Sequence, residues 1–256
     1  MTTAIRTAAT KEATSAHTAR PAAITIGVLF ICATVSAILG LLFYGPILGP
    51  DYLVRGAENK NQVILGAIME LTVVVTAIGT AIGLFPILRR YGERIALAHL
   101  CFRFLEAVTI SVGVVAVLSL VTLSQKAVRT AEVDASVFRV SGSLLLAVRA
   151  WTFILGPLLF LGINTSMYSS LLFKSRLVPR PLASLGLIGA ALVTLAAFLA
   201  MFDIAPPFTP VSGLLSAPIA VYEMVLAGWL IVKGFNSSAA VFQPARPATN
   251  ETLAAA

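Results

Sequence analysis

The chain has 256 residues, of which 58% are hydrophobic and only 11% are charged. This composition excludes an ordinary soluble globular domain and is typical of an integral membrane protein. The formal net charge of +7 comes from short basic clusters and not from one continuous basic face, so it predicts a topological signal and no nucleic-acid partner.

Six apolar stretches follow one another along the chain, each with at least the roughly 20 residues that a helix needs to cross a bilayer. They cover residues 22–44, 61–88, 94–123, 143–173, 181–202 and 211–235. The first is too long for a signal-peptide core and further spans follow it, so we expect an uncleaved helix, with a mitochondrial presequence as the alternative. In the fourth, Gly156 and Pro157 predict a kink. We therefore predict an all-α polytopic membrane protein, a bundle of six transmembrane helices forming one domain over residues 22–235.

The two ends of the chain differ from this core in composition. Residues 1–21 are rich in Ala and Thr without apolar periodicity, and residues 236–256 are rich in Ser, Ala and Pro, so both are predicted to be disordered tails. Lys and Arg gather on the side of the bundle that holds both tails and the second and fourth connections, whereas acids dilute them on the other side. This distribution predicts that both termini are cytoplasmic.

Three predicted helices each carry a glutamate far from either end, namely Glu70, Glu106 and Glu223. A carboxylate in hydrocarbon costs a few kcal/mol or more unless it is paired, protonated or in contact with water. Each of these residues therefore needs a structural or a functional reason.

Helix rise places several polar side chains at one depth. At about 1.5 Å per residue, Arg103 and Glu106 lie about 14 Å and 18 Å from the basic residue at the near end of their helix, and Asn164 and Glu223 each lie about 15 Å from theirs. Arg103 and Glu106 share a helix face, and His99 precedes Arg103 on it by one turn. We expect these side chains to converge on one layer, where Arg103 would bridge Glu106 and Glu223.

A second pair of charges lies nearer the outside. Glu70 is about 15 Å from the outer end of its helix, and Arg149 is near the outer boundary of the fourth. They could meet only if Arg149 reaches inward or the helix of Glu70 is tilted; otherwise Arg149 extends to the interface. Gly66 and Ala77 share the face of Glu70, and small residues let a neighbouring helix approach closely, which favours a glutamate directed into the bundle.

The inner layer admits two interpretations. It can be a structural ion-pair network that fixes helix register, or a site for a proton or ligand. Two acids against one arginine leave a surplus negative charge, which calls for a proton, a cation, His99 as a second partner, or water.

Other chemistry has less support in the sequence. The chain contains no His-Glu-x-x-His, phosphate-loop or Gly-x-Ser-x-Gly signature, so a non-enzymatic role is favoured. Only two histidines are present and one is in the N-terminal tail, which excludes a multi-histidine metal site, and we predict no cofactor.

Several segments resemble the recurring pattern of a known family. They are Pro50-Asp51-Tyr52-Leu53, Phe85-Pro86-Ile87-Leu88-Arg89-Arg90, Arg103-Phe104-Leu105-Glu106-Ala107, Leu177-Val178-Pro179-Arg180, and Tyr222-Glu223-Met224-Val225 leading into Gly228-Trp229-Leu230-Ile231. In them the sequence resembles the bacterial membrane proteins grouped as domain of unknown function 4386. The resemblance implies an all-helical protein of the bacterial inner membrane and assigns it no activity.

For function we predict a small transporter or channel-like protein, proton-coupled, with its polar site at Arg103, Glu106 and Glu223. A non-catalytic scaffold or accessory subunit is the alternative, and an intramembrane lipid-modifying enzyme is the third. The expected partners are membrane lipid and a small molecule or ion. Transport predicts a water-accessible cavity that reaches the glutamates, a scaffold predicts a dry and fully paired network, and an enzyme predicts a lateral opening with a nucleophile beside a base.

Overall fold

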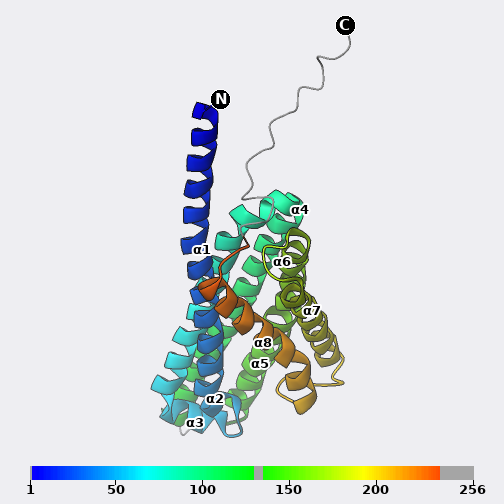
Figure 1. Cartoon of the computed structure of the whole chain (residues 1–256). Coiled ribbons are helices and arrows are strands. Elements are labelled where there is room, and N and C mark those ends of the chain that lie inside the picture. The colour runs from blue at the N-terminus through cyan, green and yellow to red at the C-terminus, as the bar shows by residue number, and fades with distance from the viewer. Residues whose placement is uncertain (1, 130–134, 237–256) are drawn as a thin grey trace.

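The computed structural model describes residues 2–129 and 135–236, and these residues form helices without β-strands. The long helices pack side by side as a bundle, as Figure 1 shows. They are α1 (Thr2–Phe43), α4 (Lys60–Arg129), α5 (Ala135–Phe153), α6 (Leu161–Ser175), α7 (Arg180–Met201) and α8 (Pro210–Val232). Two short helices, α2 (Gly45–Leu48) and α3 (Tyr52–Glu58), connect α1 to α4 at one end of the bundle (Figure 1). The predicted all-α class is confirmed.

Five helical segments in the described residues are long and apolar enough to cross a membrane, whereas the sequence predicted six. The difference arises in α4, which takes in the second and third predicted spans as one helix of 70 residues. Its geometry breaks at Gly92, where φ is 171° and ψ is 85°. Residues 60–91, the first arm, then lie alongside residues 93–129, the second arm, and bury Val63 and Ala67 against Val117 and Leu120.

The fourth predicted span is a continuous run of α5, a π-helix and α6. The π-helix, η1 (Ile154–Phe160), contains the Gly156-Pro157 pair at which we predicted a kink. Proline has no amide hydrogen to donate to the preceding turn, and a π-helical turn accommodates such an interruption. A side chain on Gly156 would approach the Thr109 hydroxyl to 2.5 Å, so the glycine lets this turn lie directly against the second arm of α4.

The N-terminal segment differs from its prediction. Helix α1 begins at Thr2 and includes almost all of the residues that we expected to be a disordered tail. Alanine is abundant there and has the highest helix propensity, so the helix continues outward from the first apolar stretch. The predicted C-terminal tail lies outside the described residues, apart from Asn236.

Two of the three apolar clusters in the described residues lie on either side of the polar layer, and the third, around Leu158, Val193 and Ile219, packs the π-helix against α7 and α8. One cluster lies near the break in α4 and includes Leu88, Leu171 and Leu230. The other lies near α2 and α3 and includes Tyr44 and Leu120. Arg103 and the polar groups around it lie at the level between these two clusters. Their side chains are buried among the helices and are not exposed to solvent.

Helices α7 and α8 approach each other through small residues. A Cβ atom on Gly189 would lie 2.9 Å from the Cα of Ile219, closer than ordinary contacts allow. Such backbone proximity is how membrane helices gain packing contacts when lipid is as apolar as their side chains. It fixes the position of α8 and therefore of Glu223.

Candidate functional site

An ion pair on the second arm of α4 forms the centre of the inner layer. Arg103 Nη1 donates to Glu106 Oε2 at 3.0 Å and to Oε1 at 3.3 Å. Arg103 is 3% exposed and Glu106 is 4% exposed, so both charges are removed from solvent. Their spacing of three residues puts them on one helix face, which is the arrangement that the sequence predicted.

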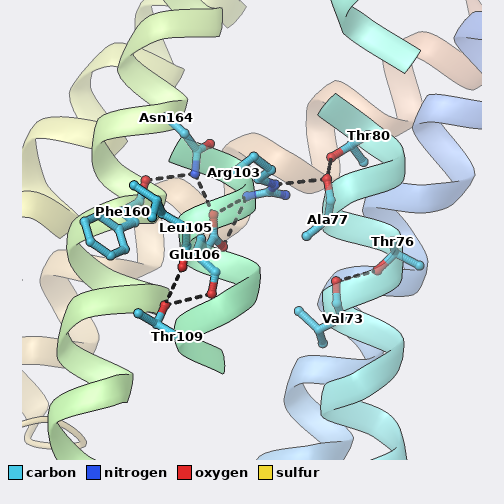
Figure 2. A network of polar contacts seen from close by, with 10 residues as sticks. All are labelled: Val73, Thr76, Ala77, Thr80, Arg103, Leu105, Glu106, Thr109, Phe160 and Asn164. Atoms are coloured by element: carbon cyan, nitrogen blue, oxygen red, sulfur yellow. Dashed lines mark hydrogen bonds and ion pairs between the residues drawn. The ribbon is translucent and has the colours of Figure 1, made fainter. Parts of the chain in front are cut away.

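This pair is tied to two neighbouring segments, as Figure 2 shows. Asn164 Nδ2 donates to Glu106 Oε2 and, at 2.8 Å, to the carbonyl oxygen of Phe160, the last residue of the π-helix. Arg103 Nε donates to the carbonyl oxygen of Ala77 in the first arm at 3.3 Å. The network therefore joins both arms of α4 to α6, and Glu106 accepts from two different side chains.

Glu223 reaches the same region from α8 but is not bound in this network. Arg103 and Glu106 lie within electrostatic range of its carboxyl group. Its Oε1 atom is buried and has no hydrogen-bond partner among the described residues. The predicted bridge from Arg103 to Glu223 is not formed, because the guanidinium group directs its hydrogen bonds to Glu106 and Ala77.

His99 lies in the layer as predicted, although it does not contact the acids. It is 1% exposed, and its ring packs edge-on against Tyr168 with 5.1 Å between ring centroids. The ring lies near the backbone of Asn164, and neither ring nitrogen has a hydrogen bond of good geometry within the described part of the chain. His99 is thus a buried imidazole whose nearest polar neighbour is the backbone of Asn164.

Tyr168 is a member of the site that the sequence interpretation missed. It is 1% exposed and stacks on Tyr222 with 6.1 Å between ring centroids. The hydroxyl groups of Tyr222 and Ser169 form a hydrogen bond of 2.9 Å. One available signal was spacing, since Tyr168 follows Asn164 by four residues and so shares its helix face.

The outer pair, Glu70 and Arg149, is formed. Arg149 Nη1 donates to Glu70 Oε2 at 3.0 Å, and Nη2 donates to Oε1, so the contact is bidentate. The side chain of Arg149 is 7% exposed and that of Glu70 is 12% exposed. The guanidinium carbon of Arg149 lies 5.2 Å from the centre of the Tyr44 ring. Arg149 therefore reaches inward, and both charges have a committed partner.

A hollow of about 340 Å³ lies on the surface of α4, between its two arms. Its lining residues are almost all apolar: Val74, Ile78, Phe104, Ala107, Val108, Ser111, Val112 and Val115. None of the candidate polar residues belongs to this lining, so this hollow is not the cavity that transport predicts. The described residues contain no group of three or more His, Cys, Asp or Glu side chains that could hold a metal ion.

Comparison with known proteins agrees with the resemblance seen in the sequence. No curated protein and no solved structure is similar enough to this chain to count as a match. The family model described as domain of unknown function (DUF4386) matches residues 25–234, which include every candidate residue of both polar layers. The chain therefore belongs to the DUF4386 family, an uncharacterised family whose long apolar helices are those of a membrane protein.

Proposed function

We propose that this protein is a small proton-coupled transporter of the bacterial inner membrane, with the proton bound in the inner layer at Glu223. In this proposal the chain crosses the membrane six times, because the two arms of α4 lie side by side and each is long enough to span. Both termini are then cytoplasmic. The exposed residues Arg94, Lys174 and Lys233 mark this end of the bundle, which we call the basic end.

The carboxyl group of Glu223 carries the proposal. Arg103 and Glu106 neutralise each other through an ion pair in which Nη1 donates to both carboxylate oxygens, so Glu223 adds a second acid without a second base. Glu223 as a residue is partly exposed, but its Oε1 atom is buried without a partner among the described residues. Such a carboxyl oxygen favours uptake of a proton or a cation, because the ionised form is expensive in an apolar medium. Folding alone gives no reason for an acid at this place, whereas a proton carrier needs one.

The structural alternative rests on a different observation. The outer pair is bidentate and largely removed from solvent, and the inner pair connects both arms of α4 to α6. Networks of this kind fix helix register without binding anything. A scaffold or accessory subunit would use both layers in this way, and Glu223 would then be permanently protonated and inert.

The test compares Glu223→Gln with Glu93→Gln, which removes an exposed glutamate at the basic end. Infrared difference spectra of the reconstituted protein should show a carboxylic acid band that changes with pH and is absent only from Glu223→Gln. Proteoliposomes under a pH gradient should show proton flux that Glu223→Gln abolishes and Glu93→Gln retains. A band that does not change with pH, together with equal flux in all three proteins, would support the scaffold and exclude the proton site.

A further inference from the structure

A series of buried polar groups without committed partners leads away from Glu223. These groups are Glu223 Oε1, the hydroxyl group of Tyr168 and both ring nitrogens of His99, none of which has a hydrogen bond of good geometry in the described residues. They come from three different helices, α8, α6 and the second arm of α4. Unsatisfied buried groups are uncommon in folded proteins, so their concentration in one place calls for an explanation.

The three residues lie in order along the bundle. Measured from the basic residue at the same end of each helix, Glu223 is about 15 Å deep, Tyr168 about 9 Å and His99 about 8 Å, at about 1.5 Å per residue. Tyr168 and His99 therefore lie between Glu223 and the basic end. The pair Arg103–Glu106 is beside this series, at the depth of Glu223.

One ring contact and one electrostatic interaction connect the members of the series. The rings of Tyr168 and His99 are in edge contact, and Tyr168 is within electrostatic range of Glu223. The Tyr168 hydroxyl lies near those of Thr165 and Tyr222 without a hydrogen bond of good geometry to either. A phenol and a neutral imidazole can each accept one proton while giving up another, which a relay requires.

We propose that Tyr168 and His99 form the proton path between Glu223 and the basic end. This inference rests on the proposed proton site at Glu223. In the transfer, the proton leaves the Glu223 carboxyl oxygen for the Tyr168 oxygen, and the phenolic proton of Tyr168 passes to a nitrogen of His99. A carboxylate and an imidazolium result, tyrosine stays neutral, and no electrons are exchanged.

The charges around the path favour onward release of the proton. Glu223 is faced by Arg103 and Glu106 from α4 and by Tyr168 from α6, and Tyr222 is its neighbour on α8. Arg103 is also within electrostatic range of His99. Burial of His99 and Coulomb repulsion from the guanidinium group both make the imidazolium short-lived, which favours loss of its proton toward the basic end.

The experiment measures how fast Glu223 changes its protonation. The reconstituted full-length protein is subjected to a pH step, and the infrared band assigned by its loss in Glu223→Gln is followed in time. Tyr168→Phe removes only the hydroxyl group, His99→Phe removes the imidazole, and Tyr44→Phe is the matched control because Tyr44 is equally buried and lies beside the outer pair. Thermal unfolding of each variant verifies that it is folded.

Both path variants should slow the change by about a hundredfold or more, the lower end of the range for a positioned proton-transfer group. The final amplitude should be unchanged, and Tyr44→Phe should react at the wild-type rate. Wild-type rates in Tyr168→Phe and His99→Phe, with the band still responding to pH, would overturn the path and leave the proton site intact. A changed amplitude at an unchanged rate would also overturn it. A wild-type protein without a pH-dependent band would refute the proton site, and the path with it.

Discussion

Changing glutamate to glutamine should have different effects on thermal stability at Glu106 and at Glu223. Glu106 accepts two hydrogen bonds from Arg103 and one from Asn164, so Glu106→Gln leaves a buried guanidinium group without its counter-ion. Removing one partner of a buried ion pair costs about 3–5 kcal/mol. For a chain of this size that corresponds to a fall in Tm of roughly 6–20 °C. Glu223 has no such partner, and glutamine resembles its protonated form, so Glu223→Gln should leave Tm unchanged or raise it.

The assay is thermal unfolding of the purified proteins in one detergent at neutral pH, with wild type and Glu93→Gln measured beside them. Glu93 is exposed, so its variant reports the effect of losing a negative charge without losing a buried contact. Equal losses in Glu106→Gln and Glu223→Gln would refute the reasoning, because both acids would then stabilise the fold equally. No loss in Glu106→Gln would show that Arg103 does not depend on it.

Three further predictions test the packing around the two layers. Glu70→Gln and Arg149→Gln should each lower the free energy of unfolding by about 3–5 kcal/mol. The double variant should lower it by less than the sum of the two single effects, and unfolding of all three variants measures this difference. Asn164→Ala removes a donor to a charged group and should lower the free energy of unfolding by about 1.5–3 kcal/mol. Gly189→Ala should cost about 1–3 kcal/mol because its Cβ would lie 2.9 Å from the backbone of α8, while Gly228→Ala, which has open space, should change stability by less than about 1 kcal/mol or increase it. Equal stability of the two glycine variants would contradict the close approach of α7 and α8.

Features that depend on one helix at a time were predictable from the sequence. The spacing of three residues between Arg103 and Glu106 determined their contact, because helical periodicity alone puts them on one face. The common depth of Asn164 and Glu106 likewise followed from helix rise, and the two side chains are in contact. Apolar length located the helices that are long and apolar enough to cross a membrane for the same reason, since it requires no knowledge of neighbouring helices.

Features that depend on how helices pack were not predictable. Depth alone did not decide whether Glu70 and Arg149 meet, because the answer depends on helix tilt and on how far the arginine side chain extends. The bridge from Arg103 to Glu223 failed because a carbonyl group of the first arm, at Ala77, competes for the guanidinium, and backbone acceptors have no signal in a sequence. The role of Tyr168 was missed for a related reason, since its ring contacts with His99 form only between helices.

The two layers have the same kinds of residues and differ in how completely they are paired. In the outer layer one acid meets one base through two hydrogen bonds, which leaves no charge to bind anything else. The inner layer has one acid too many, and Glu223 Oε1 and the nitrogens of His99 are buried without partners. A network selected only for stability would gain by replacing these groups with apolar ones. Their place beside a completed ion pair, with Tyr168 and His99 between Glu223 and the basic end, is therefore the main structural reason to look for proton movement at this end of the bundle.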